Sequence, residues 1–519
     1  MLLSSDRAVL PCVRYVRGLN LSAFKRIKAA ASFTGIGAEH GENDRVRRSA
    51  VKPPRSVGSF HARREEREWQ RLCDKYLPVR PRGSIWRFSR RRNQNDLSQG
   101  WKIHVSATIL SACDVFRSVA PYLKKRDTLF KATKSLAELQ KLNAGVFYGF
   151  SQVGKFITIY PASTENALVI ADELHALTAN QPAPIVPWDN SLHEKSCVYY
   201  RYGAFSKLDV IFRKRKVPAI SRSDGKLIRD LRKPGAAVPG WLSDPFQRMR
   251  RRATGETLTP LETSYTNYEA LIQRGKGGVY TALDHSFVPP KPCVIKEGRR
   301  YGETDWFGRD GFAGIKREAH FLKLSSPLIA AVPRIITSFQ ANGCFYLVLE
   351  RIAGKSLQNV IASRERISTR RMLDYCENMA QIVADIHAAG WAWRDCKPAN
   401  FCCQKDHKLR ALDFEGACRL RETEPPWLVT PGYLPPKGRR TSSDLEAVDL
   451  YALGTSIMQL ISRRSSPVKL GVAFNREIRE KKLPGAIAKA IHSLRSSSRK
   501  ARLSARATQQ LFEKLRATL

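Results

Sequence analysis

The 519-residue sequence lacks several features that would place it in common classes of protein. It has no run of about 18 apolar residues, so we expect no membrane-spanning helix. Charges in the N-terminal stretch MLLSSDRAVLPCVRYV come too early for the apolar region of a signal peptide. The eleven cysteines show no metal-ligand spacing, and the adjacent pair Cys402 and Cys403 does not suit a tetrahedral site. We therefore expect free thiols in a cytoplasmic protein that holds no zinc.

Acidic residues are also scarce, with 47 against 89 basic residues and a net charge of +42. Such an excess favours polyanionic partners such as nucleic acid, acidic peptides or phosphorylated ligands. The excess is spread along the chain, and no recognised nucleic-acid-reading module is present, so we expect no nucleic-acid partner. A solvated basic surface is the simpler alternative.

Composition and periodicity divide the chain into four parts. Residues 1–66 hold small residues and basic runs without a sustained period, which predicts a poorly ordered segment. Strands and helices alternate over 67–214. Residues 215–258 are rich in Pro, Gly, Ser, Lys and Arg, which is typical of a linker. Residues 259–519 begin with five short strand-like runs and continue with helices, so we expect an α+β fold in two domains.

One strand of the first domain carries polar residues in a regular pattern. Residues 101–107 alternate, with Lys102 and His104 on one face and Ile103 and Val105 on the other. We also expect helices over 109–123, 133–142 and 163–178, and strands ending at Lys131, over 155–160 and over 197–205.

Two strings in the second domain have the spacing of a phosphoryl-transfer loop. In WRDCKPANF, Asp395 can orient a substrate hydroxyl or accept its proton, and Lys397 can steady the phosphoryl group. Asn400, with Asp413 of the following string ALDFEGA, can supply oxygens to Mg²⁺. The alternative is a proline-containing loop without chemistry. The order and separation of the two strings favour phosphoryl transfer.

Weaker signals upstream suit a nucleoside triphosphate such as ATP. Gly275, Gly277 and Gly278 would let backbone amides approach its phosphates, although an ordinary hairpin turn gives the same pattern. Lys296 could reach the phosphates from a strand, and Glu318 could pair with it from a helix. A surface lysine and a solvated glutamate are the alternatives.

With these residues, the sequence over about 267–463 resembles protein kinases, which implies a bilobal fold. Asp449 is then the buried acid that holds the catalytic loop. Three departures stand out: Trp393 where kinases usually have His, Glu415 where DFG has Gly, and LPP at 434–436 instead of APE.

The departures resemble the kinase domains of class III and class IV lanthipeptide synthetases. The upstream strings GWKIHVSA, FKATKS, SQVGKFITIYP and VYYRYGAF, over about 86–206, are similar to the N-terminal lyase domain of the same family, which is related to phosphothreonine lyases. The fold class expected is thus a phosphothreonine-lyase-like domain followed by a bilobal protein-kinase-like domain.

The resemblance implies a role for each polar residue of the first domain. Lys131 would remove the Cα proton of a phosphorylated residue, once nearby cations and burial lower its pKa. His104, as imidazolium, would protonate the departing phosphate. Lys102, Lys155 and Arg201 would bind phosphate oxygens. Solvent-exposed side chains are the alternative for Lys102 and His104, and a strand-edge position is the alternative for Lys155.

The resemblance implies a kinase–lyase that phosphorylates Ser or Thr of a precursor peptide and then eliminates the phosphate. Residues 127–200 contain no Arg, where many relatives bind phosphate with one. This favours an alternative, a regulatory Ser/Thr kinase whose first domain only binds a phosphorylated or acidic partner. Residues 464–519 would complete the kinase lobe, so a zinc cyclase is not expected, and ring formation would need a separate cyclase or no enzyme.

Overall fold

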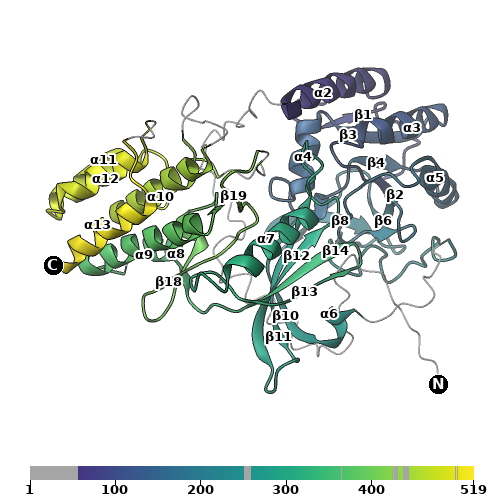
Figure 1. Cartoon of the computed structure of the whole chain (residues 1–519). Coiled ribbons are helices and arrows are strands. Elements are labelled where there is room, and N and C mark those ends of the chain that lie inside the picture. Colours follow the sequence, from purple (N-terminus) through teal and green to yellow (C-terminus); the bar gives the residue numbers. More distant parts are fainter. Residues whose placement is uncertain are drawn as a thin grey trace. The chain divides into compact units, whose positions relative to one another are not determined.

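The computed structural model describes residues 57–249, 259–363, 365–423, 425, 430–435, 444–496, 498 and 501–518. The chain divides into two compact units (Figure 1). The first holds the residues up to Lys291 together with Glu297–Ala313 and Gln340–Phe345, and the second holds Pro292–Lys296, Gly314–Phe339 and Tyr346–Leu519. None of the helices in the described ranges combines the length and apolar character needed to cross a bilayer.

The first unit is built on a six-stranded antiparallel sheet with strand order β1-β3-β4-β2-β6-β5. Its strands are β1 (Trp86–Phe88), β2 (Gln99–Val105), β3 (Leu129–Thr133), β4 (Ile157–Tyr160), β5 (Asn190–Ser191) and β6 (Val198–Ala204). The accompanying helices are α2 (Val57–Tyr76), α3 (Ala112–Lys125), α4 (Leu136–Ala144) and α5 (Thr164–Leu177), with a 3-10 turn η1 (Phe150–Gln152). Because the strand order departs from the chain order, distant segments meet on one sheet.

One face of this sheet supplies the core of the unit. Ile103 and Val105 of β2 are fully buried in a cluster that includes Trp69 of α2 and Phe116 of α3, whose rings lie 4.8 Å apart. Each such side chain stabilises the fold by about 1.5–3 kcal/mol. The alternation predicted over 101–107 is confirmed, and the opposite face is left to the polar residues. The helix expected over 163–178 is also present as α5, and Ser163 caps it by accepting a hydrogen bond from the amide of Asn166.

The prediction of a poorly ordered segment over 1–66 is wrong for 57–66, which belong to α2; residues 1–56 lie outside the described residues. The apolar residues Trp69, Leu72 and Cys73 have helical spacing and are buried in the core. Tertiary packing therefore extends order into a segment of polar composition.

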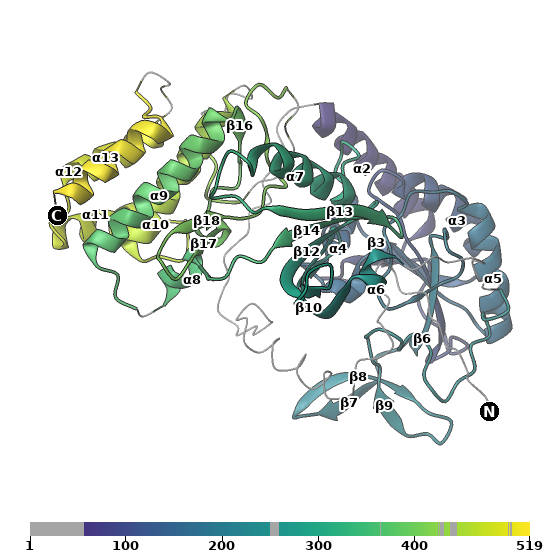
Figure 2. The same cartoon turned by 60° about the horizontal axis from the view of Figure 1, so that its bottom comes forward.

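The segment 215–258, for which composition predicts a linker, contains two strands. β8 (Arg215–Ser221) and β9 (Leu227–Arg229) form a three-stranded sheet with β7 (Asp209–Phe212), in the order β7-β8-β9 (Figure 2). Both pairs are antiparallel. The apolar runs of these strands are short and lie between basic residues, so the average composition of the segment does not indicate strands. Residues 250–258 lie outside the described part.

A five-stranded sheet follows, in the order β10-β11-β12-β14-β13, and matches the five strand-like runs expected from the sequence. Its strands are β10 (Tyr265–Arg274), β11 (Gly277–Asp284), β12 (Lys291–Arg299), β13 (Ile335–Ala341) and β14 (Cys344–Glu350), accompanied by α6 (Pro260–Thr263) and α7 (Gly311–Ser325). Strands β10 and β11 belong to the first unit, and strands β12, β13 and β14 contribute residues to both units.

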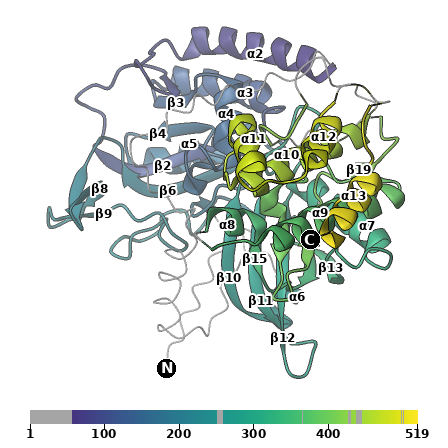
Figure 3. The same cartoon turned by 90° about the vertical axis from the view of Figure 1, so that its left-hand side faces the viewer.

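The rest of the second unit is mainly helical (Figure 3). Its helices are α8 (Leu357–Ala362), α9 (Thr369–Ala388), α10 (Leu445–Ser462), α11 (Leu470–Glu480), α12 (Gly485–Leu494) and α13 (Ala505–Ala517). Short strands lie between them: β15 (Lys355–Ser356), β16 (Trp391–Ala392), β17 (Phe401–Cys403), β18 (Leu409–Ala411) and β19 (Cys418–Arg419), with a 3-10 turn η2 (Pro398–Asn400). Helix α10 is buried along almost its whole length, which makes it the centre of this helical part.

Candidate functional site

A row of polar side chains crosses the six-stranded sheet of the first unit. The register of β2 and β6 sets Lys102 opposite Arg201. Strand β4 lies between β2 and β3, and its Thr158 pairs with His104 on one side and with Lys131 on the other. Residues paired across antiparallel strands share a face of the sheet, as do residues two apart on one strand. The register therefore places four predicted site residues on one face.

A buried carboxylate that the sequence prediction missed joins this group. Asp189 lies in the loop before β5, and its side chain is 2% exposed. His104 Nδ1 is 2.6 Å from Asp189 Oδ2, and Lys155 Nζ is 3.0 Å from Oδ1. Arg201 Nε lies 3.9 Å from the same oxygen. Because Nδ1 faces Asp189, Nε2 of His104 is the nitrogen that can face a substrate.

Arg201 has a second carboxylate partner, from the segment predicted as a linker. Its Nη2 donates to Asp230 Oδ1 at 2.6 Å and to the carbonyl oxygen of Leu231 at 3.1 Å. Lys102 makes no hydrogen bond or ion pair with any residue in the described ranges. Of the three predicted phosphate-binding cations, Arg201 and Lys155 therefore form ion pairs with carboxylates, whereas Lys102 forms none with the described residues.

Lys131 is largely buried in surroundings that lower its pKa. Its Nζ is 4.3 Å from the ring centroid of Trp86 and 5.9 Å from that of Phe88, both on the neighbouring strand β1. Burial lowers the pKa of Lys131 to about 8, and the positive charges of Arg232 and Lys155 act in the same direction. A lysine with this pKa can accept a proton near neutral pH.

The same environment changes the state expected for His104. Burial lowers the pKa of His104 to about 3, although the carboxylate of Asp189 opposes the shift. The imidazole is therefore neutral at pH 7 in this structure, whereas the sequence predicted an imidazolium. Burial and the charge of Arg201 also lower the pKa of Lys102, to about 7. Protonation of His104 requires further negative charge in the pocket, which a phosphate dianion carries.

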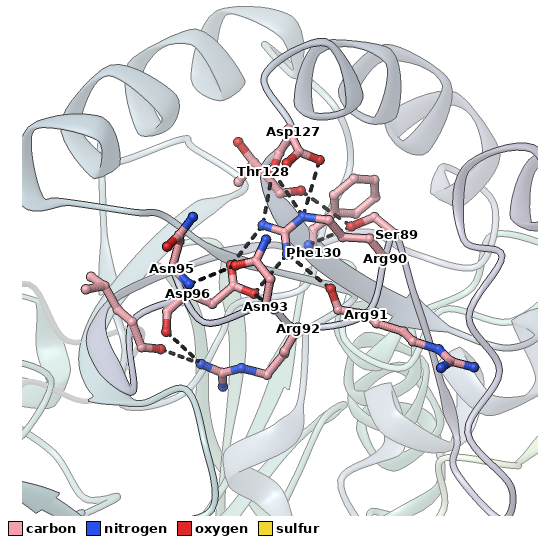
Figure 4. A network of polar contacts seen from close by, with 11 residues as sticks. Ser89, Arg90, Arg91, Arg92, Asn93, Asn95, Asp96, Asp127, Thr128 and Phe130 are labelled. Carbon is pink, nitrogen blue, oxygen red and sulfur yellow. Dashed lines mark hydrogen bonds and ion pairs between the residues drawn. The ribbon is translucent and has the colours of Figure 1, made fainter.

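A polar network fixes the edge of the sheet beside Lys131. Figure 4 shows Arg90 in a bidentate contact with Asp96, with both N–O distances 2.8 Å. The amide of Ser89 donates to the carbonyl of Phe130 at 2.9 Å, and the amide of Phe130 donates back to the Ser89 hydroxyl at 3.1 Å. These contacts hold the end of β1 against β3, so the position of Lys131 does not depend on β4 alone.

In the second unit, a buried lysine faces two carboxylates. Lys296 Nζ lies 2.9 and 2.7 Å from the two oxygens of Glu318, and 3.0 Å from Asp413 Oδ1. The ion pair that the sequence analysis expected between Lys296 and Glu318 is present. Burial alone would lower the pKa of Lys296, but the surrounding carboxylates outweigh burial and raise it. This lysine is therefore a fixed cation.

The loop that carries Asp395 is tied together by its own side chains. Lys397 Nζ lies 2.7 Å from Asp395 Oδ2, and Asn400 Nδ2 donates to the same oxygen at 2.7 Å. Thr430, which the sequence analysis did not select, donates to Asp395 Oδ1 at 2.8 Å and accepts from Lys397 at 3.1 Å. Burial raises the pKa of Asp395, although Lys397 opposes the shift. These contacts fix the orientation of the Asp395 carboxylate.

Asp449 and Trp393 hold the backbone of that loop. The fully buried Asp449 accepts from the amides of Trp393 at 2.7 Å and Arg394 at 2.6 Å, as the sequence predicted. Trp393 stands where kinases usually have His, and its indole nitrogen donates to the carbonyl of Asp413 at 2.9 Å. Its ring stacks on Phe414 at 5.3 Å. Trp393 at this position therefore supplies a hydrogen-bond donor to Asp413 and an apolar contact to Phe414.

The carboxylates around Lys296 also suit a divalent cation. Glu318, Asp413 and Glu415 each offer an oxygen within 4.8 Å of the others. Oxygen donors are the ligands that Mg²⁺ prefers, so this set fits the predicted metal. Glu415 is the residue that replaces Gly in the DFG string, and it was not among the predicted ligands. The assignment of Asn400 as a ligand stays a prediction.

Crowding explains the three glycines that were predicted to approach a triphosphate. A Cβ on Gly275 would lie 1.7 Å from the carbonyl oxygen of Asn143, and one on Gly277 or Gly278 would meet a β12 carbonyl or the Tyr280 ring. The amide of Gly275 already donates a hydrogen bond to the carbonyl of Ala144 at 3.0 Å. One of the three amides is therefore committed within the protein, and the phosphate-binding role of the loop stays a prediction.

Two family models match the chain. The model described as RamC, N-terminal domain, matches residues 71–257, and the model described as protein kinase domain matches residues 275–515. The first match covers both the polar row of the sheet and the β8–β9 segment. The predicted fold class, an α+β N-terminal domain followed by a protein-kinase domain with a sheet-rich and a helical lobe, is confirmed.

Curated relatives agree with this division. The chain is 31% identical over 369 residues to a probable SapB synthase of Streptomyces coelicolor. The alignment covers 69% of this chain and 39% of that protein. It is 25% identical over 222 residues to serine/threonine-protein kinase F of Synechocystis, which covers 39% of this chain and 44% of the relative. In each case the chain spans less than half the length of the relative.

Proposed function

We propose that this chain, which joins a RamC N-terminal domain to a protein kinase domain, phosphorylates Ser or Thr in a precursor peptide and then eliminates the phosphate. The products would be dehydroalanine and dehydrobutyrine. The observation that carries the elimination step is the sheet register, which sets Lys131, His104, Lys102 and Arg201 on one face.

The kinase domain supports the transfer step. Protein kinases in general use ATP and Mg²⁺, and Mg²⁺ supplies charge neutralisation at the transferring phosphoryl group. Asp413 with Glu415 would hold it, while Glu318 keeps Lys296 in place. Asp395 would orient the peptide hydroxyl for attack on the γ-phosphorus. Lys397 would stabilise the negative charge on the equatorial oxygens of the transferring phosphoryl group.

In the elimination step, Lys131 would take the Cα proton while the Cβ–O bond breaks and phosphate leaves. The electron pair of the Cα–H bond becomes the new Cα=Cβ bond. The leaving phosphate needs one proton, which His104 would supply after the bound dianion has raised its pKa. Asp189 would keep Nε2 of His104 turned toward the phosphate.

A second function fits one specific observation. Arg201 and Lys155 already face carboxylates and residues 127–200 contain no Arg, so the first domain has few cations available to stabilise a leaving phosphate and would only recruit an anionic partner. The chain would then be a regulatory Ser/Thr kinase with a phosphopeptide-binding domain.

Substitution of Lys131 separates the two functions. With ATP, Mg²⁺ and a Ser- and Thr-rich precursor peptide, the parent protein should yield peptide that has lost one water per modified residue, read by mass spectrometry. Lys131→Ala should accumulate phosphopeptide, because transfer continues without the base. The matched control is Lys134→Ala, an exposed lysine three residues away, which should behave as the parent.

Two outcomes would contradict the proposal in different places. If parent and Lys131→Ala both stop at phosphopeptide, the elimination step is lost and the binding function remains. If neither transfers phosphate to any Ser or Thr peptide, the kinase step itself is refuted.

A further inference from the structure

The residue after β9 places a carboxylate beside Lys102 and Arg201, two of the buried cations of the first unit, whose surroundings we call the cation pocket. Asp230 directly follows β9, and its side chain is 2% exposed. Its Oδ1 lies 2.6 Å from Arg201 Nη2. A Cβ built on Gly203 would lie 3.5 Å from Asp230 Oδ2 and 3.7 Å from Lys102 Nζ, so both groups face the same small space. An anion thus already occupies part of the site where phosphate is expected.

We propose that Asp230 is an internal substitute for phosphate, which holds the elimination pocket closed until the phosphate group of a phosphopeptide displaces it. The inference rests on the proposed elimination of phosphate. A carboxylate and a phosphate oxygen accept the same hydrogen bonds from a guanidinium, so the two compete for Arg201.

The charge balance of the pocket supports a displaceable carboxylate. Asp189 faces His104 and Lys155 and lies 3.9 Å from Arg201, whereas Asp230 pairs with Arg201 at 2.6 Å and lies 4.0 Å from Arg232. Departure of Asp230 would free the Arg201 guanidinium and remove a negative charge from the approach to the pocket. A dianion that bound beside Asp230 would instead meet like charge, which weakens binding.

The two carboxylates differ in how firmly the chain holds them. Asp189 has two cations and the His104 imidazole within 4 Å and lies beside β5 of the main sheet. Asp230 lies at the end of β9, a strand of three residues that pairs with β8 alone (Figure 2). Its amide makes one hydrogen bond, to the carbonyl of Pro218 at 2.8 Å. Moving Asp230 aside breaks its contacts to Arg201, Arg232 and the Pro218 carbonyl, on a short strand outside the main sheet, whereas moving Asp189 breaks three contacts made within the main sheet's own group of buried residues.

The end of β8 is fixed to the main sheet, which explains why Asp230 would return to Arg201. The side-chain amide of Gln99 on β2 donates to the carbonyl of Ser221 at 2.7 Å and accepts from the Ser221 amide at 2.6 Å. This double hydrogen bond joins the end of β8 to the sheet. The tip beyond it carries Asp230 back to Arg201 when phosphate leaves, so the same carboxylate would assist product release.

The test compares phosphate binding by the full chain and by Asp230→Asn, with inorganic phosphate as the probe and calorimetry as the readout. The asparagine keeps the size of the side chain and removes its charge. We expect the Kd for phosphate to fall at least about tenfold, which corresponds to about 1.4 kcal/mol. With phosphopeptide, KM should fall by a similar factor while kcat does not rise. Asp230→Glu, which keeps the charge, should stay close to the parent.

The matched control is Asp224→Asn on the turn between β8 and β9. Asp224 is exposed, lies 3.6 Å from Arg222, and should leave the Kd unchanged. Equal or weaker phosphate binding by a folded Asp230→Asn would overturn the inference. Binding of inorganic phosphate does not require elimination, so this result stands even if the parent never releases phosphate from a peptide.

A second measurement needs no variant and covers the case in which Asp230→Asn fails to fold. Hydrogen exchange at the amide of Asp230 should accelerate when the parent binds phosphate, because the contact to Pro218 opens. Unchanged or slower exchange of this amide in the phosphate complex would show that the carboxylate stays in place, which refutes displacement.

Discussion

Replacing Asp189 by Asn removes the charge that stabilises the buried cations of the first unit. Three groups lie within 4 Å of its carboxylate: His104 Nδ1, Lys155 Nζ and Arg201 Nε. Breaking a buried ion pair on one side costs about 3–5 kcal/mol, because the remaining charge is left in a medium of low polarity. We therefore expect Asp189→Asn to lower the free energy of unfolding by about that amount at pH 7.

The pH dependence of this loss can be worked out from Lys155. Burial lowers the pKa of Lys155 to about 8, although Asp189 raises it. At pH 7 the ammonium form of the parent is favoured over the neutral form by about 1.4 kcal/mol. At pH 9.5 Lys155 is neutral in both proteins, so its pairing with Asp189 contributes nothing. The destabilisation by Asp189→Asn should thus be smaller at pH 9.5 than at pH 7 by about 1.4 kcal/mol.

The sign agrees with proton linkage. The pKa of Lys155 lies below the value of about 10.4 for an unfolded lysine, so the unfolded chain binds more protons between pH 8 and 10. The parent therefore gains stability as pH rises through this window. In Asp189→Asn the pKa of Lys155 falls further, because the carboxylate that raised it is gone. The free energy of unfolding of the variant therefore begins to rise at a lower pH than that of the parent, and its total rise up to pH 9.5 is larger.

Urea unfolding of the full chain at pH 7 and pH 9.5, followed by tryptophan fluorescence, measures both quantities. The matched control is Asp172→Asn, an exposed carboxylate on α5, which should change stability by less than about 0.5 kcal/mol. A loss below about 1 kcal/mol at pH 7, or an equal loss at both pH values, would refute the assignment of Asp189 as the counter-ion of Lys155.

Two further substitutions test the kinase-domain residues. Glu318→Gln removes the carboxylate that fixes Lys296, and should lower kcat/KM for peptide phosphorylation about a hundredfold, the usual effect of a misplaced catalytic group. Gly275→Ala adds a Cβ that would lie 1.7 Å from the carbonyl oxygen of Asn143, so the backbone must shift. We expect the free energy of unfolding, measured by thermal unfolding, to fall by about 1–3 kcal/mol.

Each of these has a neutral counterpart in the same chain. Glu480→Gln, at the exposed end of α11, should leave phosphorylation unchanged. Gly471→Ala has no atom within 4 Å of the new Cβ and should not destabilise. Full activity in Glu318→Gln would mean that Lys296 is held without its carboxylate. Unchanged stability in Gly275→Ala would mean that this loop is not packed against Asn143.

The sequence by itself determined the residues whose roles depend on short spacing. Asp395, Lys397 and Asn400 lie within six residues, so one loop brings them together whatever the rest of the chain does. The alternation of β2 likewise assigns Lys102 and His104 to one face, because successive side chains of a strand point to opposite sides. These groups could be selected before the fold was known.

Tertiary structure alone decided which carboxylates meet those groups. Asp189 is 85 residues from His104, and Thr430 is 35 from Asp395. Asp230 lies in a segment whose composition is typical of a linker, yet it pairs with Arg201. Loop residues have no period that marks them, and pairing across a sheet depends on strand order. The sequence therefore located the cations of the first unit, and the fold determined how they are neutralised.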